Sequence, residues 1–169
     1  METMDAIRSR RSIRKYTEET VPENVINELL EAAMCAPSAR NERPWHFIVV
    51  HDRQILDEIA SVSPTASSLR NAPVAIAVCC DLELASSGEF WVQDCAAAME
   101  NILIAAVAEG LGAVWLGVYP REERVAAVSK VLGLPNHIVP LSLASIGYPA
   151  EGKPAANRLD PSRIHQNKW

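Results

Sequence analysis

The sequence has few aromatic residues, no paired-cysteine motif and no long apolar run. Aromatic residues make up 5% of its 169 positions. The four cysteines form no Cys-x-x-Cys pair, so we expect reduced, mostly buried thiols in a cytoplasmic protein. No apolar run reaches the roughly 18 residues that a transmembrane helix needs. The N-terminus METMDAIRSRR lacks the apolar stretch of a signal peptide, so we expect none.

Familiar catalytic and nucleotide-binding motifs are missing as well. There is no P-loop, no Gly-x-Ser-x-Gly elbow and no Gly-x-Gly-x-x-Gly after a predicted strand. No nucleophile or carboxylate pair has a recognisable partner, so in an enzyme the chemistry would belong to a bound cofactor. The histidines have no metal-ligand spacing and predict no metal site; they are His46, His51, His137 and His165.

The overall composition is that of a globular protein, with 49% apolar and 22% charged residues. No repeat and no linker divides the chain, so we expect a single domain over residues 1–169. The net charge of −5 and the pI near 5.4 argue against general nucleic-acid binding, which needs a basic face.

The hydrophobic pattern predicts four strands separated by helices. Apolar runs predict strands over residues 45–50, 74–80, 113–119 and 138–146. Apolar positions three or four apart predict helices over 4–10, 53–62, 93–110 and 122–132. A further helix is expected to begin at Thr20 and to end before Pro37. Because Thr20 and Glu23 have the spacing of a capping box, we expect Thr20 to be the N-cap of that helix.

The predicted helix over 93–110 is apolar nearly all round. Between residues 95 and 108 only Glu100 and Asn101 are polar, which is typical of a central core helix or a subunit contact. Strands interleaved with helices predict a layered α/β or α+β domain whose sheet is covered on both faces. Residues 147–169 are rich in Pro, Asn, Arg and Lys and predict an extended tail, which a second copy of the chain would help to stabilise.

Cations are concentrated at the start of this acidic chain. Residues 8–15 hold four arginines and a lysine, and the arginine fork is well suited to phosphate. In an extended segment Arg10, Ser12 and Arg14 point to one side, and on a helix Arg10 and Arg14 still share a face. Either arrangement lets two guanidinium groups converge on one anion. The alternative, a solvated basic turn, remains open for this cluster taken alone.

Several stretches together resemble the signatures of the nitroreductase family. The first is Arg10-Arg11-Ser12-Ile13-Arg14-Lys15-Tyr16, and the second is Ala36-Pro-Ser-Ala-Arg-Asn-Glu-Arg-Pro-Trp-His-Phe47, in which Arg43 stands where Gln is usual. Further matches are Leu69–Pro73, Gly110–Gly117 and the ending marked by Lys153, Pro154, Arg158 and Trp169. The matches run in order through essentially the whole chain.

This resemblance implies an α+β fold: a three-layer α-β-α sandwich with a mostly antiparallel sheet, a long buried helix and an extended C-terminal tail. It also implies a homodimer that binds FMN noncovalently at the subunit interface. Carried over to this sequence, the cofactor-binding residues are Arg10, Arg11, Ser12, Arg14, Pro37, Ser38, Ala39, Asn41, Trp115, Leu116, Gly117 and Arg158.

The resemblance further assigns parts of FMN to these residues. Arg10, Ser12 and Arg158 would hold the ribityl phosphate, and Arg14 would lie at the pyrimidine end of the ring. Residues 115–117 would lie along the ring, with a backbone N–H facing N5. Residues 37–41 would reach the flavin from the partner subunit.

The implied activity is that of an NAD(P)H-dependent flavin oxidoreductase. NADH or NADPH would deliver hydride to FMN, and a nitroaromatic, quinone or similar acceptor would then take its place, in a ping-pong cycle. The segment from Asp81 to Phe90 is shorter than is usual in the family. We therefore expect an open pocket with Phe90, Trp91 and Arg40 at its edge.

Other interpretations stay open at this point. Trp115 is compatible with a plain core position, Ser38 and Asn41 with ordinary turns, and Arg158 with a solvated tail. The protein could be an FMN protein of the same fold that does not turn over nicotinamide. A basic arm that binds nucleic acid or acidic membrane is a second alternative, disfavoured by the acidic remainder of the chain.

Overall fold

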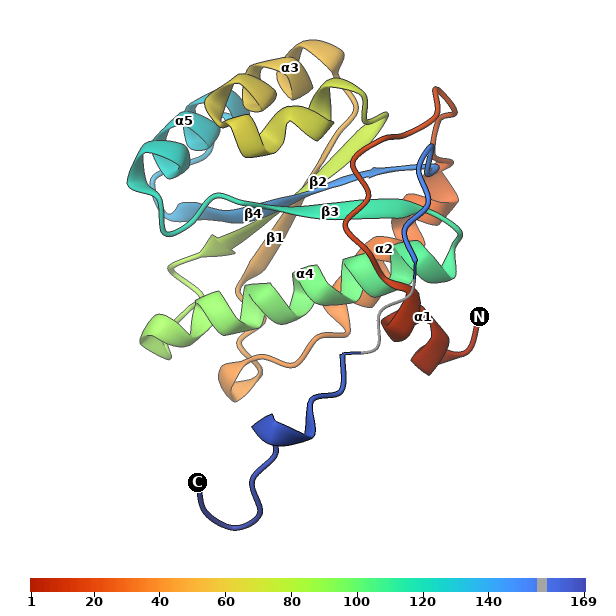
Figure 1. Ribbon diagram of the computed structural model, residues 1–169. Helices are drawn as coiled ribbons and strands as arrows, with labels where there is room; N and C mark the ends of the chain where they lie inside the picture. The colour runs from red at the N-terminus through yellow and green to blue at the C-terminus, as the bar shows by residue number, and fades with distance from the viewer. Residues whose placement is uncertain (155–157) are drawn as a thin grey trace.

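The computed structural model describes residues 1–154 and 158–169. At its centre is an antiparallel sheet of four strands in the order β1-β2-β4-β3 (Figure 1). The strands are β1 (Trp45–Val50), β2 (Val74–Asp81), β3 (Gly112–Gly117) and β4 (Ile138–Gly147). Antiparallel pairing throughout this sheet confirms the α+β class.

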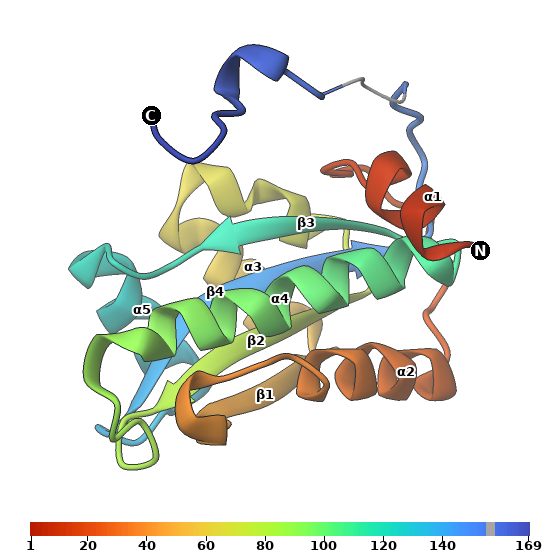
Figure 2. The same ribbon diagram turned by 90° about the horizontal axis from the view of Figure 1, so that it is seen from below.

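Helices cover both faces of the sheet. On one side lie α2 (Glu23–Met34) and α4 (Trp91–Ala108), and on the other lie α3 (Arg53–Val62) and α5 (Glu122–Leu132) (Figures 1 and 2). Each pair of helices packs against one face of the sheet and forms a separate apolar cluster with it. The central strand β2 is therefore buried from Val74 to Cys80, which explains its continuous apolar run. The edge strand β1 is only partly buried, and its His46 is exposed.

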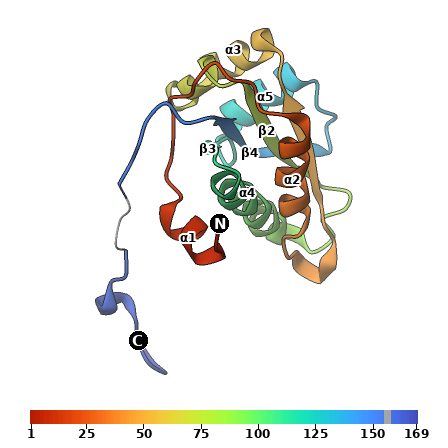
Figure 3. The same cartoon turned by 90° about the vertical axis from the view of Figure 1, so that its right-hand side faces the viewer.

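Short elements complete the chain. The helix α1 (Thr3–Ser9) packs against α4. Four 3₁₀ turns are η1 (Ala39–Asn41), η2 (Pro64–Arg70), η3 (Gly88–Phe90) and η4 (Pro161–Arg163). Beyond β4 the chain runs back along residues 11–17, and residues 158–169 lie away from the layers and are exposed (Figures 1 and 3).

Every predicted strand and helix is present, with boundaries that are the predicted ones or differ by one or two residues, but the predicted N-cap of α2 is not confirmed. β1, α3 and α5 have the predicted limits, and α5 ends at Gly133 in the left-handed conformation that suits glycine (φ 64°). The capping-box prediction is wrong, because α2 begins at Glu23 with Pro22 as N-cap and no side-chain cap. Thr20 lies two residues before that N-cap, too far along the chain to act as the cap.

The long helix α4 is buried on one side. The segment Gly88–Ala108 has the length and composition to cross a membrane, yet 44% of its apolar stretch is buried inside the fold. It packs on α2 and on strands β2, β3 and β4, as a core helix does. Its opposite side, which includes Ala97 and Ile104, is only partly covered.

Three of the four cysteines are buried, as predicted. These are Cys79, Cys80 and Cys95, whereas the free thiol of Cys35 is exposed. Burial raises the pKa of Cys79 to about 12. The pKa of Cys95 is also raised, first by its hydrogen bond with Cys80 and then by burial. These two thiols therefore stay protonated and unreactive near neutral pH.

Candidate functional site

The basic segment of residues 10–16, here called the arm, lies along the edge strand β3. Ser12 forms a parallel bridge with Ala113, and the Ile13 N–H donates to Ala113 O at 3.0 Å. Ile13 is buried against Gly112, where an added Cβ would lie 2.6 Å from Ile13 Cγ2. The arm is thus extended, and its alternation directs successive side chains to opposite sides.

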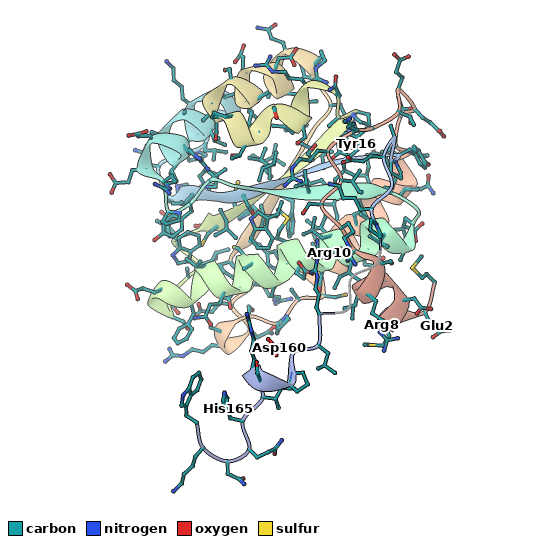
Figure 4. The ribbon with its side chains drawn as sticks, viewed as in Figure 1. Glu2, Arg8, Arg10, Tyr16, Asp160 and His165 are labelled. Atoms are coloured by element: carbon teal, nitrogen blue, oxygen red, sulfur yellow. The ribbon has the colours of Figure 1, made fainter. Side chains whose placement is uncertain are left out.

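The buried Tyr16 anchors the far end of the arm. Its hydroxyl lies 2.9 Å from Ser145 O and 2.7 Å from Ile13 O, and its one proton is shared between these two carbonyl oxygens. Burial raises the pKa of this phenol, so it remains a donor at neutral pH. In Figure 4 Tyr16 lies at the end of the sheet, and Arg10 lies beside α4.

The C-terminal segment runs along the same arm. The Arg14 N–H donates to Glu151 Oε1 at 2.7 Å, and this bond is the main reason that the pKa of Glu151 is lowered. Lys153 Nζ donates to Ser12 O, and Arg11 Nε donates to Pro154 O at 2.9 Å. Both ends of the chain therefore meet beside β3.

The arm arginines differ in how they are held. Arg10 Nε lies 3.4 Å from Glu100 Oε1 on α4. Arg11 also donates to the carbonyls of Arg8 and Arg10, yet its buried Nη2 has no acceptor among the described residues. An unpaired buried donor is costly unless a ligand or water satisfies it. Arg158 is exposed, and within the described residues it makes no hydrogen bond or ion pair.

Arg14 lines a hollow of about 380 Å³ between the arm, β3 and η2. Trp115 lies in its wall with 37% of its surface exposed, so it is not a plain core residue. A Cβ at Gly117 would meet nothing within 4 Å, which leaves the backbone open to a ligand. This volume is within the usual range of small-molecule sites.

The hollow contains side chains that sequence reasoning did not identify. Arg124 reaches it from α5 and donates from Nη1 to Gly117 O at 3.1 Å. Pro64, Thr65 and Ser67 reach it from η2. The polar stretch from residue 63 to 71 was visible in the sequence, but only the fold brings it to β3.

The second predicted group lies elsewhere in the chain. Pro37, Ser38 and Ala39 line a separate hollow of about 450 Å³ at the first turn of α4, together with Phe90, Gln93, Asp94 and Ala97. The two hollows share no lining residue. A single chain therefore does not bring residues 37–39 to the hollow that Arg14 and Trp115 line.

Polar contacts fix the shape of the loop from Pro37 to Pro44. The Ala39 N–H donates to Asp94 Oδ1 at 2.9 Å, and the Arg43 N–H donates to Ser38 Oγ at 2.9 Å. Asn41 and Arg43 have φ values of 58° and 48°, a conformation that asparagine tolerates best among residues with a side chain. Arg43 stands where the family usually has Gln, but its bond to Ser38 is made by the backbone N–H and does not depend on that side chain.

A neighbouring loop is tied to this one through Glu42. Its Oε1 accepts from Ser86 Oγ at 2.5 Å and Ser87 Oγ at 2.7 Å, and its Oε2 accepts from the Ser87 N–H at 3.1 Å. These bonds, that of Ser86 first, lower the pKa of Glu42. The short segment after β2 is therefore held against the loop from Pro37 to Pro44.

The three residues predicted at the edge of the open pocket lie in different environments. Phe90 lines the second hollow and is 52% exposed. Trp91 is buried and meets Tyr119 edge to face with ring centroids 4.8 Å apart, so its predicted edge position is wrong. The reason is a long-range aromatic contact that the local sequence does not reveal. Arg40 is exposed on η1 and does not line either hollow.

Comparison with known proteins gives one consistent result. A family model described as the Nitroreductase family matches residues 7–66 and 61–148. A protein of Methanothermobacter thermautotrophicus, provisionally named NADH dehydrogenase/NAD(P)H nitroreductase, is 52% identical over 169 residues, which cover 100% of this chain and 88% of the relative.

Two crystal structures are similar over the whole chain. One is of a provisionally named NADH oxidase from Clostridium acetobutylicum, with a TM-score of 0.95 and 45% identity over 98% of this chain and 100% of that chain. The other, from Desulfovibrio desulfuricans, is of a provisionally named nitroreductase in complex with FMN. It has a TM-score of 0.86 and 31% identity over 100% of this chain and 98% of that chain.

Proposed function

Because the chain belongs to the nitroreductase family, we propose that it is an FMN-dependent NAD(P)H oxidoreductase that acts as a cytoplasmic homodimer. Its acceptors are nitroaromatics, quinones or similar electron-poor compounds. The observation that carries the proposal is the hollow beside the arm, where Arg14, the exposed Trp115 and the open backbone of Gly117 meet.

The phosphate of FMN is assigned to the cations at the two ends of the chain. A phosphate monoester carries about −1.5 to −2 charges and three strong acceptor oxygens. Arg10 and Ser12 supply donors from the arm, while Arg11 is held by the carbonyls of Arg8, Arg10 and Pro154 and supports the arm from its other side. Arg158 is assigned to the same group and would have to move in from the exposed tail.

The flat ring of FMN is assigned to the hollow itself. Trp115, Leu116 and Gly117 form the floor along β3, and the guanidinium groups of Arg14 and Arg124 lie at its rim. Positive charge at the pyrimidine end favours electron uptake by the bound ring. The hydroxyls of Thr65 and Ser67 offer hydrogen bonds to the polar ring edge.

The second half of each site is assigned to the partner subunit. Pro37, Ser38 and Ala39 line a hollow that shares no residue with the arm's hollow, and Asn41 belongs to the same loop. A dimer that pairs the arm of one chain with the loop of the other would complete the site. The partly covered side of α4 and the exposed Met4 and Ile7 of α1 are apolar surface suited to such an interface.

FMN bound there would supply the redox chemistry, namely hydride acceptance from NAD(P)H and two-electron transfer to the acceptor in a ping-pong cycle. The chain's residues bind and orient the ring and set the charge around it. Because solvent reaches the open hollow, the acceptor can take its proton from water, and no protein acid or base is required. This agrees with the absence of an acid/base pair in the sequence.

The test is a visible spectrum of the purified protein followed by an anaerobic titration with each nicotinamide. We expect a bound flavin spectrum that bleaches stoichiometrically with NADH or NADPH, and parallel double-reciprocal lines in steady-state kinetics. A bound flavin that neither nicotinamide reduces would instead identify an FMN protein with another role. Intersecting lines would rule out the ping-pong cycle.

A further inference from the structure

Three metal-ligating side chains meet at the end of the sheet remote from the arm's anchor. One ligand atom each from Asp81, Glu83 and His137 lies within 4.8 Å of the other two. Asp81 ends β2, Glu83 lies in the turn that follows, and His137 directly precedes β4. The sequence spacing of these residues gave no sign of the cluster, because antiparallel pairing of β2 with β4 creates it.

The backbone holds the three residues in place. Asp81 pairs with Ile138 across the strands, and the Leu82 N–H donates to His137 O at 2.9 Å. Asp81 Oδ1 accepts the Glu83 N–H at 2.8 Å, which orients the carboxylate and leaves Oδ2 available. A site built on strand ends is more rigid than one built on a free loop.

A second imidazole approaches the same carboxylate. His46 Nε2 lies 3.6 Å from Asp81 Oδ2. Ligand atoms on a tetrahedral zinc ion, with bonds of about 2.0–2.1 Å, lie about 3.3 Å apart. His46 pairs with Cys79 on β2, so its ring stands diagonally across from Asp81. The His46 side chain is 54% exposed and can turn toward the group.

The charges of the cluster also favour a cation. Two carboxylates face one another here, and no Lys or Arg forms an ion pair with either of them within residues 1–154 and 158–169. The Asp81 side chain is only 13% exposed, so solvent screens its charge poorly. Adjacent carboxylates repel, and a divalent ion removes that repulsion.

We infer that His46, Asp81, Glu83 and His137 form a binding site for a divalent transition-metal ion of the zinc type. Two imidazoles and two carboxylates match zinc, whereas calcium and magnesium prefer oxygen ligands alone. The inference does not depend on flavin binding.

The site lies at the base of the two loops that Glu42 joins. The Asp81 N–H donates to Pro44 O at 2.7 Å, where the loop from Pro37 enters β1. Glu83 belongs to the other loop, whose Ser86 and Ser87 bind Glu42. A bound ion would therefore fasten both loops to the sheet, as a structural rather than a redox centre.

Isothermal titration of the purified, flavin-containing protein with ZnCl₂, after chelator treatment, tests the site. We expect one saturable site per chain and a rise in the melting temperature when zinc is added. Glu83→Gln and His137→Asn are each expected to weaken zinc binding at least about tenfold. Glu83→Gln is the safer variant, since its side chain is exposed and makes no hydrogen bond in the described residues.

His51→Ala is the matched control, because His51 is an exposed histidine that lies 4.0 Å from Glu23, outside the cluster. It should bind zinc as the parent protein does. Unchanged affinity in both Glu83→Gln and His137→Asn would overturn the inference. An equal loss in His51→Ala, or no saturable binding by the parent protein, would overturn it as well.

Discussion

Ile13 lies directly over Gly112, and the contact leaves no room for a side chain at position 112. An added Cβ would stand 2.6 Å from Ile13 Cγ2 and 2.8 Å from Ile13 Cβ. The neighbouring Ile13 N–H bonds to Ala113 O. The glycine thus lets the arm lie flat on β3 and sets the position of Arg14 relative to the hollow.

Gly112→Ala should therefore displace the arm. Overpacking of this kind costs about 1–3 kcal/mol of unfolding free energy, and we expect FMN affinity to fall with it. Gly152→Ala is the control, since its Cβ would meet nothing within 4 Å and its φ is not positive. Chemical denaturation and flavin titration of both variants provide the measurement, and equal stability of the two would contradict the assigned contact.

Gly117→Ala should weaken FMN binding and leave the unfolding free energy nearly unchanged. A methyl group at this position meets no protein atom, so the unfolding free energy should change by less than about 1 kcal/mol, the propensity range of a strand position. The same methyl group would project where we assign the flavin ring, and we expect FMN affinity to fall at least about tenfold. Normal FMN affinity in this variant would place the ring elsewhere.

Arg10→Ala should also weaken FMN binding with little effect on folding. The ion pair with Glu100 is partly exposed, at 20% and 48% of the two side chains, and such pairs contribute about 0–1 kcal/mol. A hydrogen bond to a charged phosphate contributes about 1.5–3 kcal/mol, or roughly a 10- to 150-fold change in affinity. Arg8→Ala, at an exposed cation of α1, should bind FMN normally. An equal loss of FMN affinity in Arg8→Ala and Arg10→Ala would show that binding depends on net charge and not on a contact made by Arg10.

The Glu42 contact should be lost in acid. Its hydrogen bonds lower the pKa of the folded carboxyl, so their contribution is complete above the ordinary value of 4.5 and is lost as the pH falls through the lowered pKa. We expect the protection of the Ser87 amide against hydrogen exchange to drop in that acidic range. Glu42→Gln should show no titration there, and a parent-like acid drop in this variant would assign the effect to another group.

The sequence predicted regular elements well wherever local signals agreed. The strand from Trp45 and the helix from Arg53 have the predicted limits, because an apolar run after Pro44 and apolar positions three or four apart after Arg53 mark these elements. The prediction failed at Thr20, where two competing start signals stood close together and Pro22 took the N-cap position. Local pattern alone does not decide between such signals.

Candidate site residues came from the sequence only where a motif carried them, and their roles stay predictions. The arm and Trp115 were found from their motifs, and the fold places Arg14 and Trp115 on one hollow. Thr65, Ser67 and Arg124 were missed because they reach that hollow from elements distant in sequence. Trp91 was misplaced for the same reason, since its contact with Tyr119 depends on tertiary packing.

The central claim is that each flavin site joins the arm of one chain to the loop of another, and subunit mixing tests it most directly. The arm variant carries Arg10→Ala and Arg14→Ala, and the loop variant carries Ala39→Leu and Asn41→Gly, whose glycine suits the positive φ of position 41. Each variant alone should bind little FMN. In a mixed dimer one of the two sites is wild type on both sides.

After dissociation and random reassembly of an equal mixture, we predict that about one quarter of the sites bind FMN again and are bleached by a nicotinamide. Half of the dimers are then mixed, and each has one intact site. If mixing restores no FMN binding although exchange of subunits is verified, both lesions lie in the same chain's site, and the account is contradicted.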